Sequence, residues 1–142
     1  MQTYVFVQSE FYTQPVPGQS GVFRGDMQKA VKGLPDIVGF NGVASQYLAH
    51  PLSITVAKPV RLFVVNAGPS HFSAFHVIGT IFAKAYVGGN PANGLSGLQT
   101  LTIAPGDGAM AEFTVQQNGR YPFVTHQFGD ADLGAIGAFL AQ

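Results

Sequence analysis

Cysteine is absent from all 142 residues of this chain. Its absence excludes disulfides, zinc–cysteine sites and cysteine nucleophiles. It also excludes a type 1 (blue) copper centre built by this chain, because that centre needs a thiolate ligand. Any metal chemistry must therefore use histidine or carboxylate ligands.

Charged residues are also scarce, since Asp, Glu, Lys and Arg make up 10% of the chain and their formal charges cancel. This balance gives no electrostatic basis for binding nucleic acid or an anionic membrane. No apolar run approaches the ~20 residues that span a bilayer. The start, Met1–Tyr4, has neither the basic segment nor the apolar run of a signal peptide, so we expect none in this chain. With 46% hydrophobic residues, the composition predicts one folded domain over 1–142.

What the sequence does contain is a series of short apolar runs separated by Gly, Pro and Asn, which is typical of β-strands and turns. The expected strands are Thr3–Val7, Asp36–Phe40, Leu52–Val56, Val60–Asn66, Phe72–Ile78, Ile81–Val87, Leu98–Ala104, Ala109–Val115, Arg120–Thr125 and Gly134–Leu140. We expect loops at Gln14–Gly21 and Gly88–Gly97. The best helical stretch is Asp26–Leu34, with Asp26 as N-cap and Gly33 near its end, and Phe128–Leu133 has room for one helical turn. These patterns predict an all-β Greek-key sandwich with one or two short helices.

The four histidines are His50, His71, His76 and His126. None pair at the i, i+4 spacing of a helical metal site, and the five-residue gap from His71 to His76 puts these two on opposite faces of an ideal strand. A metal site must therefore collect ligands from distant strands or another chain. His126 ends a strand, which fits either a ligand or a surface histidine. His76 lies in an apolar run, which fits either a functional histidine or a buried one with a polar partner.

Other chemistry has little support in the sequence. Asp130 and Asp132 alternate near His126, and we interpret them as solvated acids in a loop rather than a catalytic carboxylate pair. Ser70 and Ser73 show no nucleophile-elbow pattern. The glycines of Gly88–Gly97 lack any phosphate-binding arrangement. The sequence therefore gives no support for a hydrolase or a nucleotide-dependent enzyme.

Seven segments occur in the order found in one known family. They are PDIVGFNG (Pro35–Gly42), VRLFVVNAGPS (Val60–Ser70), SAFHVIG (Ser73–Gly79), LQT (Leu98–Thr100), APGDGAMAEF (Ala104–Phe113), GRYPFVTH (Gly119–His126) and GAIGAFL (Gly134–Leu140). On these segments the chain resembles the second, C-terminal cupredoxin domain of copper-containing nitrite reductases. The pairing of FHVIG with a strand-ending VTH is the most specific part of the resemblance.

The resemblance implies a trimer in which each subunit has two cupredoxin domains. The first domain holds the type 1 copper and two histidine ligands of the type 2 copper, and the second domain of a neighbouring subunit supplies the third. His126 matches that third ligand, and His76 matches the histidine that helps deliver protons to nitrite. Ile78 matches a residue that crowds the copper, and Thr100 matches one that orients the active-site histidine. Gln99 stands where some members carry an acid.

The implied function is the type 2 copper half-site of a periplasmic enzyme that reduces nitrite to nitric oxide. Neither the N-terminal cupredoxin domain nor a set of type 1 ligands is present in this sequence, so we expect little turnover by the chain alone. The alternative is a stand-alone trimeric cupredoxin with a structural or metal-binding role and no redox turnover. A laccase-like domain ranks last, because no His-x-His pair for a trinuclear copper cluster occurs.

Overall fold

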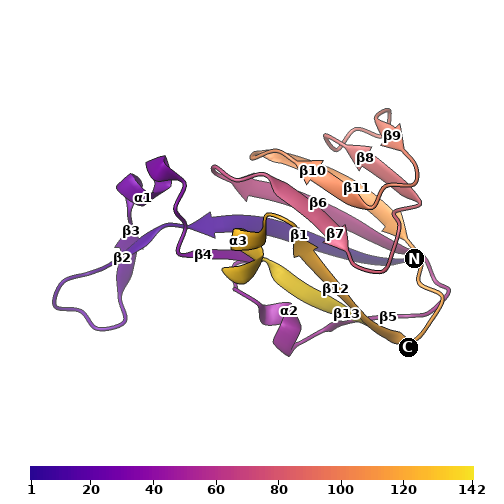
Figure 1. Ribbon diagram of the computed structural model, residues 1–142, viewed down its shortest axis with the longest axis horizontal. Helices are drawn as coiled ribbons and strands as arrows, with labels where there is room; N and C mark the ends of the chain where they lie inside the picture. Colours follow the sequence, from indigo (N-terminus) through magenta and orange to yellow (C-terminus); the bar gives the residue numbers. More distant parts are fainter.

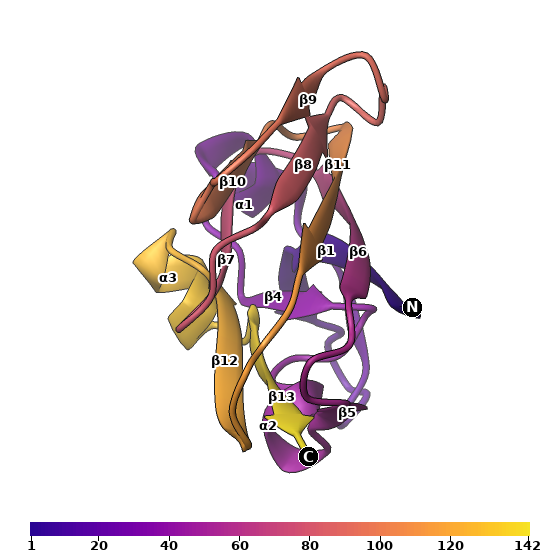
Figure 2. The ribbon, with the colours of Figure 1, turned by 90° about the vertical axis from the view of Figure 1, so that its right-hand side faces the viewer.

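Two β-sheets face each other in the computed structural model, which describes residues 1–142 (Figures 1 and 2). The six-stranded sheet has the order β4 (Ile37–Phe40), β1 (Gln2–Phe11), β6 (Val60–Gly68), β11 (Asp107–Phe113), β8 (Lys84–Val87), β9 (Gly94–Leu95). The five-stranded sheet has the order β10 (Thr100–Ile103), β7 (Ser73–Val77), β12 (Gly119–Thr125), β13 (Ile136–Ala141), β5 (Leu52–Ile54). The chain crosses repeatedly between the sheets, from β6 to β7, β7 to β8, β10 to β11 and β11 to β12. The prediction of an all-β sandwich is confirmed.

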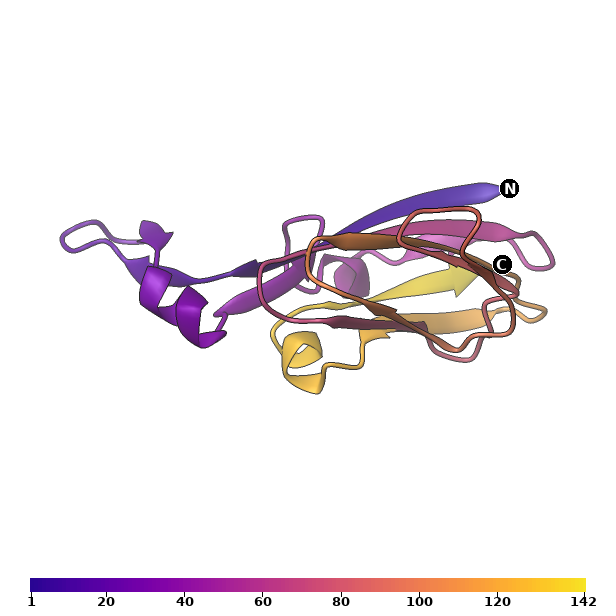
Figure 3. The ribbon, with the colours of Figure 1, turned by 90° about the horizontal axis from the view of Figure 1, so that it is seen from above.

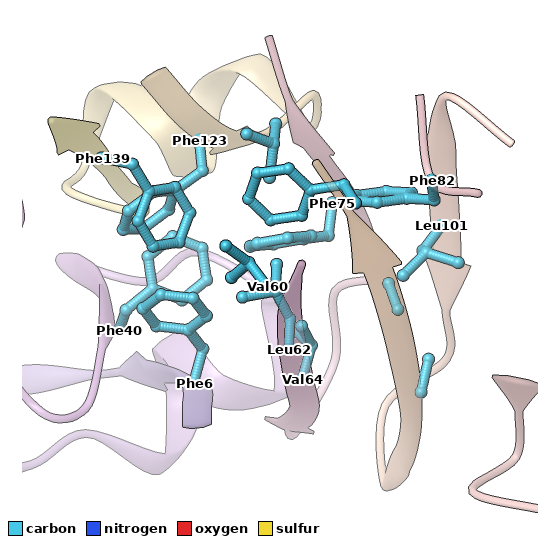
Figure 4. Close-up of a cluster of buried hydrophobic side chains, with 14 of the residues drawn as sticks. Phe6, Phe40, Val60, Leu62, Val64, Phe75, Phe82, Leu101, Phe123 and Phe139 are labelled. Carbon is cyan, nitrogen blue, oxygen red and sulfur yellow. The ribbon is translucent and has the colours of Figure 1, made fainter. Parts of the chain in front are cut away.

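Strand alternation decides which side chains enter the core. In β6, Val60, Leu62 and Val64 point inward and are fully buried, while the residues between them are partly or largely exposed, as the period of two requires. Seven of the 12 phenylalanines are fully buried: Phe6, Phe40, Phe75, Phe82, Phe113, Phe123 and Phe139. They form the aromatic core between the sheets shown in Figure 4. Each buried side chain of this kind contributes roughly 1.5–3 kcal/mol of transfer free energy.

One end of the sandwich carries a projecting arm, made of β2 (Thr13–Pro15), β3 (Phe23–Gly25) and α1 (Met27–Lys32). Figures 1 and 3 show the arm at the end opposite to both chain termini. The Asp26 carboxylate caps α1 by accepting hydrogen bonds from the N–H groups of Gln28 and Lys29, at 2.9 and 3.1 Å. Gly33 ends the helix at φ 62°, a left-handed conformation that glycine adopts without steric cost. Both predicted ends of this helix are confirmed.

The structure has three helices, one more than the sequence predicted. The unforeseen one is α2 (Gln46–Ala49), a single turn whose N-cap makes no side-chain hydrogen bond; α3 (Phe128–Asp132) occupies the link where one turn was expected. The expected strand Ile81–Val87 starts only at Lys84, and the expected loop Gly88–Gly97 contains β9. Such short elements follow from tertiary pairing more than from local sequence. None of the three helices is long and apolar enough to cross a membrane.

Candidate functional site

His76 and His126, 50 residues apart in sequence, meet on the outer face of the five-stranded sheet. β7 pairs antiparallel with β12, with Val124 opposite His76, and the His126 backbone N–H donates to the Ala74 carbonyl at 2.8 Å. Residues paired in this way point to the same side of a sheet. The two imidazole centroids lie 5.2 Å apart, edge to face. The register of two core strands therefore brings together the histidines that the sequence could only name separately.

Thr100 completes the surroundings of His76 from the other neighbouring strand. It lies directly opposite His76 in the antiparallel pairing of β10 with β7. Its Oγ1 is 3.3 Å from Nδ1 of His76. A hydroxyl can donate or accept, so this contact is open to either imidazole tautomer and restricts rotation of the ring.

His76 is half-buried, and its surroundings oppose a positive charge. Burial lowers the pKa of His76 below its usual value, and the nearby His126 lowers the pKa further by charge repulsion. Phe75 and Val77, its neighbours in β7, point into the core, which fixes the backbone that carries His76. The surroundings therefore disfavour the charged form of the ring, and the strand holds the ring in place.

His126 itself is exposed, yet its backbone is firmly tied. The Thr125 hydroxyl accepts hydrogen bonds from the N–H groups of Ala74, at 3.0 Å, and Gln127, at 3.3 Å. Thr125 is fully buried, so its hydroxyl ties the end of β12 to β7 and also holds the residue that follows the histidine. The His126 imidazole stands in solvent on a rigid mount, which suits a ligand donated to a metal outside the chain.

Two exposed apolar side chains lie two residues after the histidines in the sequence. Ile78 follows β7 on the same side as His76 and is 42% exposed, with its N–H held by the Pro122 carbonyl at 2.7 Å. Phe128, two residues after His126, is 84% exposed. Both side chains leave apolar surface exposed near the ends of β7 and β12.

The chain alone does not build a complete metal centre. No three His, Cys, Asp or Glu side chains gather closely enough to hold an ion. A copper centre that used these histidines would therefore need further ligands from outside this cluster.

One pair of residues escaped the sequence analysis. Asp130, interpreted as a solvated acid, is 2% exposed, and its Oδ1 lies 2.8 Å from Nδ1 of His71. The other nitrogen of His71, Nε2, lies 2.9 Å from the Gly33 carbonyl. The interpretation of Asp130 is thus wrong, whereas Asp132 is exposed as expected. Partners 59 residues apart leave no pattern in the local sequence that would predict the pair.

The architecture defines the class of protein as a cupredoxin-type sandwich. A solved multicopper oxidase superposes on 99% of the chain with a TM-score of 0.80 at 18% identity, a likeness that concerns the fold alone. No protein-family model matches the chain.

Sequence comparison relates the chain to one family within this class of fold. The chain is homologous to copper-containing nitrite reductases: it is 39% identical over 137 residues to the enzyme of Neisseria gonorrhoeae and 38% identical over 137 residues to that of Neisseria meningitidis serogroup B. Each match covers 94% of this chain but about a third, 34% and 35%, of the relative. The copper-containing nitrite reductase of Thermus scotoductus superposes on 99% of the chain, and on 31% of its own, with a TM-score of 0.88 at 31% identity.

Proposed function

We propose that this chain is the second cupredoxin domain of a copper-containing nitrite reductase and supplies half of its type 2 copper site. In this proposal His126 is a copper ligand, and His76 is an acid–base residue that does not bind the metal. The observation that carries it is the convergence of these two imidazoles to 5.2 Å on one sheet face. The homology over 94% of the chain supports the same assignment.

The bound copper would supply the electron and the positive charge that binds nitrite. Reduction of nitrite to nitric oxide and water consumes one electron and two protons, and the protons require a donor beside the substrate. His76 meets this need, because histidine titrates nearest to neutral pH and this ring is held by Thr100. Its lowered pKa would make the imidazolium a stronger acid, so that a proton taken up by His76 is passed on to the substrate.

Ile78 is proposed to shape the space for nitrite. It lies two residues beyond His76, on the same side of the chain, and its exposed side chain would border the space where nitrite binds. A branched apolar side chain restricts how a small ligand orients without offering it a hydrogen bond. Ile78 and Thr100 thus act on the substrate and on His76, and neither is a metal ligand.

The missing ligands define the partner. Because the chain spans about a third of the relatives it matches and collects no three-ligand group, we propose that an N-terminal cupredoxin domain with the type 1 copper completes the site. We further propose that the domain works in a homotrimer, so that His126 meets ligands of a neighbouring subunit, and that the complete enzyme acts in the periplasm. The exposed Ile78 and Phe128 are apolar surface that such a partner would cover.

The second candidate is a stand-alone trimeric cupredoxin that binds metal or serves a structural role without redox turnover. The observation that favours it is the same absence of a three-ligand group. In that case three symmetry-related His126 side chains would be the only ligands. The two candidates differ in whether His76 affects a reaction.

Copper(II) titration of the 142-residue chain tests the roles, with isothermal calorimetry as the measurement. We expect His126→Ala to abolish stoichiometric copper binding and His76→Ala to leave it nearly intact. His50→Ala is the matched control, because His50 is an exposed histidine at the end of α2. Loss of copper in His76→Ala with retention in His126→Ala would invert the assignment. Unchanged binding in both variants would mean that the chain contributes no ligand.

Turnover is tested in a polypeptide that also carries the first cupredoxin domain. There, His76→Ala should depress nitrite reduction while copper stays bound. Loss of an acid–base residue typically costs 10²–10⁴-fold in rate. Full activity of His76→Ala would reject the acid–base role, whereas a two-domain wild type that does not reduce nitrite would favour the second candidate.

A further inference from the structure

Helix α3, which follows His126, is anchored by an acid. Asp130 is its only buried residue, and Phe128, its largest apolar side chain, is 84% exposed. Oδ1 of Asp130 contacts His71, while Oδ2 is buried without a hydrogen-bond partner. A buried carboxylate is costly unless it is paired. The position of α3 therefore depends on His71.

His71 lies between two acceptors. Nδ1 faces the Asp130 carboxylate at 2.8 Å, and Nε2 faces the Gly33 carbonyl at 2.9 Å. A neutral imidazole carries one N–H and an imidazolium carries two. Only the doubly protonated ring can donate to both acceptors at once. Its two hydrogen bonds then join α3 to the end of α1, where the last carbonyls carry partial negative charge.

The charges around His71 are all of one sign. Besides Asp130 from α3, the Glu10 carboxylate from β1 accepts hydrogen bonds from the backbone N–H groups of His71, at 2.7 Å, and Ser70, at 3.1 Å. The Tyr12 hydroxyl donates to Glu10 and brings no charge. On α1, the Lys29 ammonium is occupied by Asp36 at 2.6 Å, and Lys32 is exposed. No cation competes with the imidazolium.

The titration of His71 and Asp130 follows this geometry. Burial alone would lower the pKa of His71, but the hydrogen bonds to Asp130 and Gly33 and the negative charges of Asp130 and Glu10 outweigh it, so the pKa is raised. Burial raises the pKa of Asp130, and the contact with His71 offsets this only in part. Each group therefore holds its proton more tightly than usual. The stability that the folded protein gains from the raised pKa of His71 is complete below the ordinary histidine value of about 6.5 and is lost as pH rises through the raised value.

We propose that His71 is a positioning residue: as an imidazolium it clamps α3 to the end of α1 and thereby fixes His126, and loss of its proton releases one of the two contacts. The path to His126 is short. The Gln127 carbonyl accepts hydrogen bonds from the N–H groups of Asp130, at 2.9 Å, and Ala131, at 3.1 Å, and Gln127 follows His126 directly. The consequence for copper rests on the function proposed above, while the clamp itself does not.

Nuclear magnetic resonance of the 142-residue chain tests the clamp without metal. We expect the His71 imidazole to titrate above the ordinary value of about 6.5. The amide signals of His126 and of Phe128–Asp132 should shift with the same midpoint. Titration of His71 at or below the ordinary value, or α3 and His126 signals that ignore it, would overturn the proposal.

Two substitutions of His71 each keep one of its two hydrogen bonds and remove the other. The substituted side chains, Asn and Gln, do not titrate. In His71→Asn the amide nitrogen takes the place of Nδ1 and retains a donor for Asp130. In His71→Gln the amide nitrogen takes the place of Nε2 and retains a donor for the Gly33 carbonyl only. Both should remove the pH-dependent shifts. Because each variant breaks one of the two contacts of the clamp, both should displace the His126 and α3 signals from their low-pH wild-type positions, and His50→Gln serves as the control that changes nothing in α3.

Copper(II) titration then separates the clamp from the proposed function. His71→Gln should bind copper roughly tenfold more weakly than wild type at neutral pH, as expected for a residue that supports a ligand, and His71→Asn should also bind more weakly than wild type below the His71 midpoint. The ratio of wild-type to His71→Asn affinity should fall as pH rises through the His71 midpoint. If wild type binds no copper but the His126 signal follows His71, the proposed function fails and the clamp stands. If copper binds through His126 and His71→Gln binds as tightly as wild type, the positioning role is rejected.

Discussion

Thr100 faces His76 across the pairing of β10 with β7, with its Oγ1 3.3 Å from Nδ1 of the imidazole. Two backbone strands hold this contact, because both residues lie inside regular elements rather than in loops. A ring held in this way presents one edge steadily toward His126, whose centroid is 5.2 Å away. The pair thus combines an imidazole held within the sheet with an exposed one.

Thr100→Val removes the hydroxyl and keeps the shape of the side chain. We expect copper binding to persist, while the two ring nitrogens of His76 change their tautomer balance, as measured by nitrogen chemical shifts. In the complete enzyme, turnover should fall. Thr102→Val is the control, since Thr102 lies on the same face of β10 opposite Ala74. Identical His76 spectra in wild type and Thr100→Val would show that the contact does not orient the ring.

A second prediction concerns colour. Copper(II) added to the chain should give no intense blue absorption, because that band arises from charge transfer from a thiolate and the sequence has no cysteine. Visible spectroscopy during the copper titration is the measurement. An intense band like that of a type 1 centre would contradict the proposed ligand chemistry.

Local features of the fold were predictable from sequence, and features that depend on distant pairing were not. Asp26 and Gly33 set the ends of α1 through hydrogen bonds within a few residues, so the pattern sufficed. The family resemblance indicated His76 and His126, but their approach depends on the register of β7 against β12. Asp130 was misjudged because an acid in a Gly/Asp-rich link is normally solvated. The contact with His71, which comes from a distant loop, offsets the cost of burying the Asp130 carboxylate.

Tyr12 should be the last tyrosine to ionise. Burial, the hydrogen bond donated to Glu10 and the negative charges of Glu10 and Asp130 raise the pKa of Tyr12 to about 12. The pKa of Tyr12 in the folded state lies above the ordinary value of about 10. The protonated hydroxyl therefore contributes to stability fully below about pH 10, and this contribution is lost as pH rises toward 12.

The measurement is the ultraviolet absorbance of tyrosinate during an alkaline titration, with circular dichroism recorded in parallel. Tyr12→Phe should remove the absorbance step that occurs at the highest pH. Glu10→Gln should move that step to lower pH. Ionisation of all five tyrosines near their ordinary value while the circular dichroism remains native would contradict the assignment.

The proposed homotrimer predicts a mass close to three times the 15.0 kDa of one chain. Sedimentation equilibrium at micromolar concentration measures it. The first cupredoxin domain contributes part of the interface in the family that the sequence resembles, so the same measurement on the two-domain polypeptide is the matched comparison. A monomer mass in both experiments would reject the trimer.

The final prediction concerns packing under the histidine face. At Gly137 in β13, an added methyl group would lie 2.3 Å from Cζ of Phe123 and 2.6 Å from Cβ of Tyr47. Phe123 is fully buried in the aromatic core, so it has little room to move. Overpacking of this kind typically costs about 1–3 kcal/mol. Gly137→Ala should therefore lower the free energy of unfolding by about that amount in urea denaturation, whereas Gly129→Ala, which meets open space in α3, should be neutral or slightly stabilising. Equal stability of Gly137→Ala and wild type would show that β13 and Phe123 are packed less tightly than the structure indicates.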